Sequence, residues 1–206
     1  MTASSTLGRA IAGALALAMV TATPLLAQDA ARAPLTLASA RISLAGTSNI
    51  HDYTASTSTV RIVRIQVASG LGNDILPALL EPGALQAFEI AIPAASLHST
   101  KDGLDKNMHK ALKVKEHADI VFRLTRLEAK GEKLHAVGAL RIAGVEKDVA
   151  FDIATTVKNG SLVVSGSVDL LMTDFGIAAP KAMMGMLRTD PKVTISFETV
   201  LSTPLT

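Results

Sequence analysis

The feature that most constrains the fold of this chain is a series of segments in which apolar and polar residues alternate. Residues 192–201 show it clearly, because Val193, Ile195 and Phe197 fall on one face of an extended chain. Lysine, threonine, serine and glutamate occupy the positions between and beside them. Successive side chains of a β-strand point to opposite faces, so the pattern predicts a strand with one buried face.

Further segments alternate in the same way or are rich in β-branched residues. They are residues 35–46, 53–67, 84–97, 118–128, 133–144, 149–157 and 161–172. Asn159-Gly160 is typical of a two-residue hairpin turn, and Gly144 with Val145–Lys147 is expected to turn the chain before residue 149. Residues 173–190, rich in Gly, Pro and Met, are expected to form a long loop. Strands joined by short turns favour antiparallel pairing.

Residues 99–117 change to a helical period. Asp102, followed three positions later by Asp105, resembles a capping pair at the start of a helix. One helical face would then collect four apolar residues, Leu104, Met108, Ala111 and Leu112. The sequence thus predicts a single short helix between the third and fourth strands.

These elements predict an all-β fold, an eight-stranded antiparallel β-barrel with one short capping α-helix. Closing the sheet into a barrel removes the exposed edges of its outer strands. The interior of an eight-stranded barrel is either filled by side chains or able to hold one small ligand. Both interpretations remain open at the level of the sequence.

The alternation also predicts which side chains face the interior. The wall residues are expected to be Ile42, Leu44, Phe88, Ile90, Phe122, Leu124, Leu140, Ile142, Phe151, Ile153, Leu170, Ile195 and Phe197. Met108 and Leu112 of the helix, with Met183, Met184 and Met186 of the long loop, are expected to close one end. Methionine is flexible and suits a variable apolar ligand, although ordinary loop packing explains these residues as well.

The composition favours an aliphatic ligand over an aromatic one. Hydrophobic residues make up 49% of the chain but aromatic residues only 3%, and Trp is absent. A wall of Val, Leu, Ile and Met offers few rings on which an aromatic ligand could stack. Polar residues at strand ends, such as His51, Tyr53 or Thr173, are candidates for contacting a polar head group.

Residues 1–27 resemble a secretory signal peptide, which leaves residues 28–206 as the barrel domain. Arg9 precedes an unbroken apolar run from Ala10 to Val20, and small residues then lead to a cleavage site after Ala27. The run is shorter than the roughly 20 residues that span a bilayer. We therefore expect a periplasmic protein, with an uncleaved membrane anchor as the alternative.

Little in the sequence indicates catalysis, a cofactor or a metal. The chain has no Cys, and its five His include no pair four residues apart on a helix. His51-Asp52 is adjacent in sequence, so a strand would point the two side chains to opposite faces. A hydrolase nucleophile motif and a phosphate-binding loop are also absent. We expect no enzyme, with a His-dependent metalloenzyme as the least favoured alternative.

The charge gives no reason to expect nucleic-acid binding. The formal net charge is +2, and the cations are spread along the chain. A mild cluster occurs in and after the predicted helix, at Lys106, Lys110, Lys113 and Lys115. A solvated helix face explains this cluster at the level of the sequence.

Four sequence blocks resemble the YceI-like family. They are GTSNIHDY (46–53), DKNMHKALKVKEHADIVF (105–122), GALRIAGVEKDVAF (138–151) and LLMTDFGIAAPKAMMGMLRTDPKVTISF (170–197). The resemblance covers the chain from about Thr36 to Leu201. LDKNMHKAL stands where many members carry R-D-x-H-L, and LLMTDFGI stands where others carry N-R-x-D-F-G-I.

The resemblance implies a lipocalin-like barrel that binds polyisoprenoids or related lipids. The expected function is periplasmic binding or carriage of a long-chain amphipathic lipid, such as a polyisoprenoid or an isoprenoid quinone. The expected partners are a long-chain isoprenoid or fatty lipid and, as an open question, a second copy of the chain. The alternative is a stress-related interaction protein whose barrel is filled and holds no ligand.

Overall fold

A computed structural model describes residues 35–71, 75–131, 133–179, 181–182 and 187–203. All of them belong to one compact unit, Ala33–Thr206. The predicted signal peptide lies outside the described residues, and so do Met183, Met184 and Met186.

Strands dominate this unit, and three helical segments and one longer helix connect them. In chain order the elements are β1 (Thr36–Ser48), β2 (Tyr53–Thr57), β3 (Arg61–Val67), α1 (Ile75–Ala78), β4 (Leu85–Pro93), η1 (Ala94–Ser96), α2 (Asp102–Ala111), β5 (Asp119–Lys130), β6 (Lys133–Ile142), β7 (Val145–Lys158), β8 (Ser161–Leu171), η2 (Met172–Phe175), β9 (Lys181–Ala182) and β10 (Leu187–Ser202).

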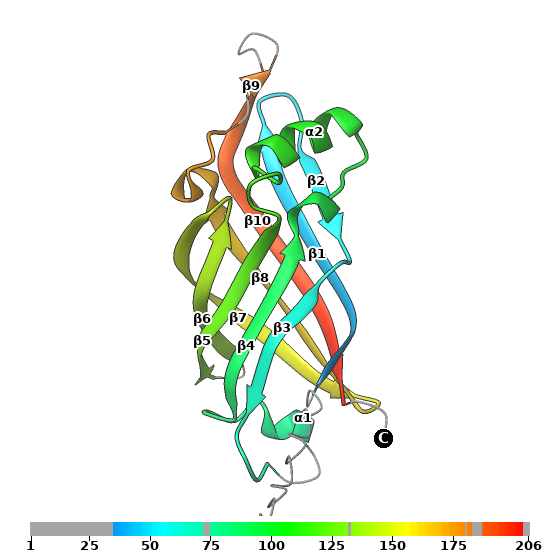
Figure 1. Ribbon diagram of the computed structural model, residues 1–206, viewed down its shortest axis with the longest axis vertical. Helices are drawn as coiled ribbons and strands as arrows, with labels where there is room; N and C mark the ends of the chain where they lie inside the picture. Colours follow the sequence, from blue (N-terminus) through cyan, green and yellow to red (C-terminus); the bar gives the residue numbers. More distant parts are fainter. Residues whose placement is uncertain (1–34, 72–74, 132, 180, 183–186, 204–206) are drawn as a thin grey trace, which may run out of the picture. The chain divides into compact units, whose positions relative to one another are not determined.

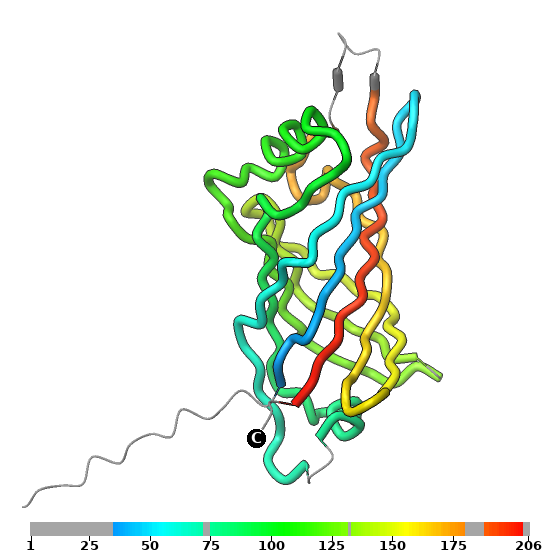
Figure 2. Tube along the Cα trace, turned by 90° about the vertical axis from the view of Figure 1, so that its right-hand side faces the viewer, coloured from blue at the N-terminus to red at the C-terminus, as the bar shows by residue number. Residues whose placement is uncertain are grey.

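The strands form one antiparallel sheet with the order β2-β1-β10-β8-β7-β6-β5-β4-β3, and β9 pairs with β10. The sheet curls on itself, so that its first and last strands come to the same side (Figures 1 and 2). These two strands, β2 and β3, follow each other directly in the chain. The chain therefore completes the ring by passing from β2, which pairs with β1, to β3, which pairs with β4. The predicted all-β class is confirmed.

The predicted strand at 53–67 is in fact broken into β2 and β3, so the strand count differs from the expected eight. The Thr57 hydroxyl accepts a hydrogen bond from the Thr59 backbone N–H at 3.0 Å and lies 2.8 Å from the Ser96 hydroxyl. Such local side-chain bonds compete with the ladder of a sheet. Residues 58–60 therefore leave the sheet, and the chain changes its partner from β1 to β4.

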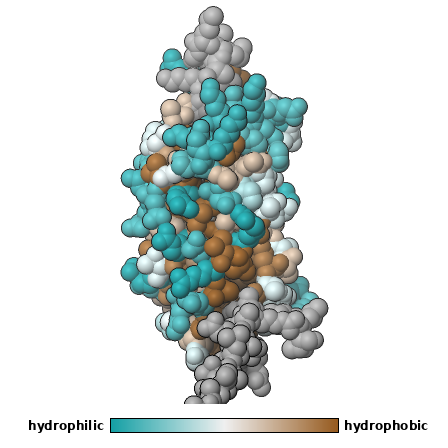
Figure 3. Space-filling model, in the orientation of Figure 1, coloured by the Kyte–Doolittle hydropathy of each residue, from teal (hydrophilic) through white to brown (hydrophobic). Residues whose placement is uncertain are grey.

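This change of partner leaves a seam between the first half of β1 and β3. Residues 36–41 of β1 pair only with β10, and no ladder joins them to β3 among the described residues. Apolar side chains close the seam, because Leu37, Ile62 and Ile65 pack in one cluster. Apolar atoms reach the surface in this part of the molecule (Figure 3).

Two predicted connections differ from the structure. Val145–Lys147 belongs to β7, and the turn before it consists of Ala143 and Gly144 alone, with φ angles of 49° and 85°. Two residues with positive φ close a hairpin without a longer loop. The expected loop at 173–190 contains η2 and β9, and β10 already begins at Leu187. The Asn159-Gly160 hairpin is confirmed, with φ angles of 52° and 70°.

The predicted helix is α2, but its start is built differently from the expected capping pair. The residue at its N-cap is Lys101, which makes no side-chain capping bond. The Asp105 carboxylate instead accepts a hydrogen bond from the backbone N–H of Ser99, 2.7 Å away and outside the helix. The short helix α1 lies in a connection where the sequence predicted no helix.

The two α-helices lie at opposite ends of the curled sheet (Figure 1). Near α1, one buried apolar cluster contains Leu35, Leu76, Leu79, Leu162 and Leu201. A second cluster packs against α2 and η2, and it contains Ala94, Leu97, Leu112, Ala143, Leu170, Phe175, Ile177 and Val193. We call these two regions the α1 end and the α2 end.

Candidate ligand-binding cavity

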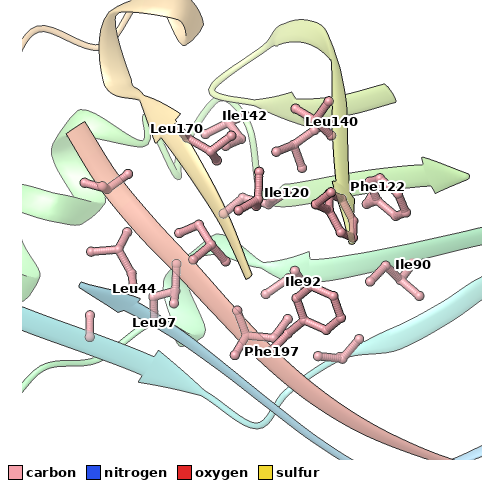
Figure 4. A pocket seen from close by; sticks show the side chains of 18 of the residues that line it. Leu44, Ile90, Ile92, Leu97, Ile120, Phe122, Leu140, Ile142, Leu170 and Phe197 are labelled. Atoms are coloured by element: carbon pink, nitrogen blue, oxygen red, sulfur yellow. The ribbon is translucent and has the colours of Figure 1, made fainter. Parts of the chain in front are cut away.

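A cavity of about 1010 Å³ runs through the interior of the curled sheet. Residues from both ends line it, including Leu79 beside α1 and Leu112 beside α2. Ten of the lining side chains, all apolar, are labelled in Figure 4. Ligand pockets usually measure about 300–1,000 Å³, so this cavity is at the large end of the range.

The wall residues predicted from alternation are brought together here. All thirteen of them line the cavity, and so do Met108 of α2 and Leu112, which follows the last residue of α2. This outcome follows from the pleat of the strands, which sends every second side chain inward. The predicted contribution of the loop methionines concerns residues outside the described part of the chain.

Sequence reasoning missed a larger set of lining residues. Some lie on a face that had been recognised, such as Ile92 and Ile120, which continue the alternation of Phe88 and Phe122. Others come from segments without a clear period, such as Leu79 and Leu80 after α1 or Leu97 after η1. Continuing each alternation to the end of its strand finds the first group, whereas the second group needs the tertiary structure.

The inward side chains are not packed as they are in a filled core. Among the described residues, no large side chain is less than 2% exposed. Leu44, Ile90, Leu140 and Ile195 face inward and yet are only partly buried. Side chains of a close-packed interior lose nearly all of their accessible surface. The barrel interior therefore holds open apolar space along its length.

Three phenylalanines lie side by side in the middle of this wall. The ring centroids of Phe122 and Phe151 are 5.6 Å apart, and those of Phe151 and Phe197 are 5.5 Å apart. Gly138 and Gly166 make room for them, because an added Cβ at either position would collide with the ring of Phe122 or Phe197. These glycines are therefore positions of close approach that allow aromatic rings to lie along the wall.

At the α1 end, none of the described residues that line the cavity is charged. Leu35, Leu37, Leu79, Leu80 and Leu85 line it there. Leu76 of α1 is 4% exposed and packs behind them in the same cluster. This end is therefore suited to the terminus of an aliphatic chain.

Among the described residues, every charged one that lines the cavity lies at the α2 end. These are Asp52 from the connection between β1 and β2, Lys101 beside the start of α2, and Lys110 and Lys113 at its end. Polar neighbours in the lining are Ser48, His51, Tyr53, Thr54, Thr100, Asn107 and Thr189. Of the predicted head-group candidates, His51 and Tyr53 lie in this lining and Thr173 does not.

Tyr53 lies against the backbone of β1 at this end. Its ring occupies the place where a side chain on Gly46 would be, and the two residues pair across β1 and β2. Burial, with a smaller contribution from the charge of Asp190, raises the pKa of the Tyr53 phenol. The phenol is therefore neutral at physiological pH and able to donate a hydrogen bond.

Polar contacts fasten α2 to the segment before it. Asp105 binds the Ser99 N–H, and its other oxygen lies 3.0 Å from His98 Nδ1. The hydrogen bonds from Ser99, and then from His98, lower the pKa of Asp105 to about 2. At the other end of the helix, His109 donates from Nε2 to the carbonyl of Leu97 at 2.8 Å. We call these contacts the α2 latch.

The described residues show neither a metal-binding cluster nor a membrane-spanning helix. They contain no group of three or more His, Cys, Asp or Glu side chains arranged to hold a metal ion. In the same part of the chain, every helix is too short or too polar to cross a membrane.

The comparisons with known proteins identify the class first. A model of the YceI-like domain matches residues 38–201, which is most of the chain. The protein therefore belongs to the YceI-like family. The resemblance seen in the sequence blocks is thereby confirmed. A search of curated protein sequences finds no match.

Solved structures share the fold at low sequence identity. BcnA from Burkholderia cenocepacia matches with a TM-score of 0.62 and 13% identity, covering 80% of this chain and 96% of that one. A polyisoprenoid binding domain from Saccharophagus degradans gives 0.61 and 10%, covering 84% and 100%. A YceI protein from Campylobacter jejuni gives 0.55 and 19%, covering 74% and 85%. At such identities these matches establish the architecture and not the ligand.

Proposed function

We propose that this protein binds and carries a long-chain amphipathic lipid, of the polyisoprenoid or isoprenoid-quinone type, inside its barrel. One observation carries the proposal: a cavity of about 1010 Å³ is apolar along its length, and the charged residues that line it lie at one end in the described part of the chain. An amphipathic lipid has the same asymmetry. A neighbour of the same fold is described as a polyisoprenoid binding domain, which supports this ligand class.

Burial of the lipid chain is enough to drive such binding. Each methylene removed from water contributes about 0.8 kcal/mol, so ten to fifteen methylenes contribute roughly 8–12 kcal/mol. Ordering the chain and losing its free translation offset a good part of this gain. A micromolar or tighter affinity therefore needs only the apolar wall and a polar group near the entrance.

The open interior favours a carrier over a barrel filled by its own side chains. A filled barrel would bury its inward residues, whereas Leu44, Ile90 and Ile195 keep part of their surface accessible. Apolar surface left open to water is unfavourable. A bound apolar ligand would remove this cost.

We propose further that the lipid is carried in the periplasm. The support is the signal-peptide pattern of residues 1–27. Protein recovered from a periplasmic fraction should begin at Gln28, which the intact mass measures. An intact mass that still includes residues 1–27 would favour the membrane-anchor alternative. A homodimer stays a prediction, to be checked by light scattering.

The lipid is best tested on protein purified from a periplasm. Mass spectrometry of its organic extract should find an isoprenoid or fatty lipid at about one molecule per chain. An empty extract, combined with no uptake of added prenol or fatty lipid, would contradict the proposal and favour the filled barrel.

A matched pair of variants makes this test specific to the cavity. Ile195 faces inward, and its neighbour Ser196 is exposed on the outer face of the same strand. Ile195→Trp should obstruct the cavity and lower the amount of extracted lipid, whereas Ser196→Trp should leave it unchanged. Because the chain has no Trp of its own, the emission wavelength of the new indole reports whether each variant is folded as designed.

A further inference from the structure

We propose that the α2 end of the cavity is a subsite for an anionic head group, so that the preferred ligand is a long-chain lipid ending in a phosphate or a carboxylate. This inference rests on the proposed function, because it names the head group of the lipid. It starts from Lys101, Lys110 and Lys113, which all line the cavity at that end.

Unlike some cations of the barrel wall, the three lysines have no carboxylate partner. On the wall, Arg61 binds Asp119 and Lys192 binds Asp169, each at 2.8 Å. Within the described part of the chain, no salt bridge involves Lys101, Lys110 or Lys113. Their ammonium groups are therefore available to an anion that arrives with the ligand.

The nearby acidic groups do not cancel this positive charge. Asp52 is the single carboxylate among the lining residues, against three lysines. Asp105 is already bound to Ser99 and His98, and Asp190, whose charge acts on Tyr53, accepts a hydrogen bond from the Lys192 N–H. His51 and Tyr53 supply further polar atoms in the same lining, and the raised pKa of Tyr53 keeps its phenol a donor. The rim therefore offers more donors than acceptors to a head group.

Lys113 occupies a backbone position at which glycine is the usual residue. Lys113 has a φ of 52° and is the left-handed residue that ends α2. Its N–H donates to the Lys110 carbonyl and the Val114 N–H donates to the His109 carbonyl, the bond pattern of a Schellman motif. Glycine is the usual residue at this position, since a side chain disfavours the conformation. Here the chain carries a cation into the cavity rim instead.

All four lysines of the cluster are exposed, as a solvated helix face predicts, but Lys110 and Lys113 also line the cavity. Lys106 and Lys115 belong to the same segment but do not line the cavity. The cluster thus divides into two lysines at the cavity rim and two away from it. This division supplies a matched control with the same change in net charge.

The test compares three ligands with the same C18 chain: oleyl alcohol, oleic acid and oleyl phosphate. Their affinities at pH 8 are measured by displacement of a fluorescent apolar dye from the full mature chain. We expect both anions to bind about tenfold more tightly than the alcohol, as two or three exposed ion pairs would give. The advantage should shrink in 0.5 M NaCl, because salt screens exposed charges.

Two double variants test whether the rim lysines cause the tighter binding of the anions. Lys110→Gln/Lys113→Gln should remove most of the affinity advantage that each of the two anions has over oleyl alcohol on the same variant. Lys106→Gln/Lys115→Gln should leave both advantages unchanged. A larger advantage for oleyl phosphate than for oleic acid would assign the subsite to a phosphate, and equal advantages would show that a carboxylate suffices.

Three outcomes would overturn the inference. Equal affinity for the alcohol and both anions would leave lipid binding intact and disprove the head-group subsite. Equal losses in the two double variants would point to long-range attraction, as expected of an anionic membrane surface, and not to a site. Failure of all three ligands to displace the dye would refute the proposed function itself and the subsite with it.

Discussion

The two ends of the barrel are closed by different kinds of residues. At the α1 end, Leu76 and Leu79 are 4% and 3% exposed, and the described residues of the cavity wall there are uncharged. At the α2 end, the buried apolar cluster lies beside a rim with three lysines and an aspartate. The helix there is held by the polar contacts of the α2 latch.

This difference indicates that stability is concentrated at one end and recognition at the other. A seal of buried leucines gains free energy from area alone and has no directional requirement. Exposed ion pairs and hydrogen bonds add little stability, but they place charges and donors where a ligand can meet them. We therefore expect substitutions at the α1 end to act mainly on folding and those at the α2 end mainly on binding.

The largest effect is expected from Leu76→Ala, which leaves a hole in the seal of the α1 end. Removing a buried leucine side chain costs about 2–5 kcal/mol, measured as the change in free energy of unfolding by urea. Leu171→Ala is the matched control, since Leu171 is 43% exposed and should change stability by less than about 0.5 kcal/mol. Similar losses for both variants would show that α1 is not a stabilising seal.

The thirteen predicted wall residues could be found because the geometry of a strand is repeated in the sequence. Phe88 and Ile90 pair with Leu124 and Phe122 across β4 and β5, and each was placed inside by its alternation alone. A period of two leaves only the choice of which face is buried. The face that carries the hydrophobic residues is the buried one.

The ends could not be predicted in the same way, because their residues come together from separate segments. α1 has only four residues, Ile75–Ala78, too few for a helical period to be read. The break after Thr57 depends on a contact with Ser96, which is distant in the sequence. Likewise, the role of Asp105 as a latch residue depends on where Ser99 lies in space. Tertiary contacts decide these features, and no local pattern reports them.

A smaller effect of opposite sign is expected from Lys113→Gly at the α2 end. Glycine relieves the left-handed backbone but gives up chain entropy and the attraction of a cation to the helix terminus. We expect a net gain of roughly 0.5–1 kcal/mol in the free energy of unfolding, together with weaker binding of anionic lipids.

Lys115→Gly is the control for this gain. Lys115 is close by in sequence and exposed, but its φ is not positive. Glycine at this position relieves no left-handed backbone, so the free energy of unfolding should stay unchanged or fall. If Lys113→Gly destabilises the protein instead, the lysine at this position serves the fold, and the contrast between the two ends is weaker than proposed.

The smallest effect is expected from the pH dependence of the α2 latch. The pKa of Asp105 is lowered to about 2 by its bonds to Ser99 and His98, whereas an unfolded chain has an aspartate pKa of about 3.9. The latch therefore contributes its full stability above about pH 4 and loses it as the pH falls toward 2. Melting temperatures of the natural chain and of Asp105→Asn should differ at pH 5 and converge near pH 2.

Asp152 and Asp169 also have lowered pKa values, but both proteins carry them, so their effects cancel when the two melting temperatures are subtracted. Asp102→Asn, an exposed change in the same helical turn, should follow the natural chain. A constant difference between the natural chain and Asp105→Asn across this range would mean that the carboxylate does not hold the helix.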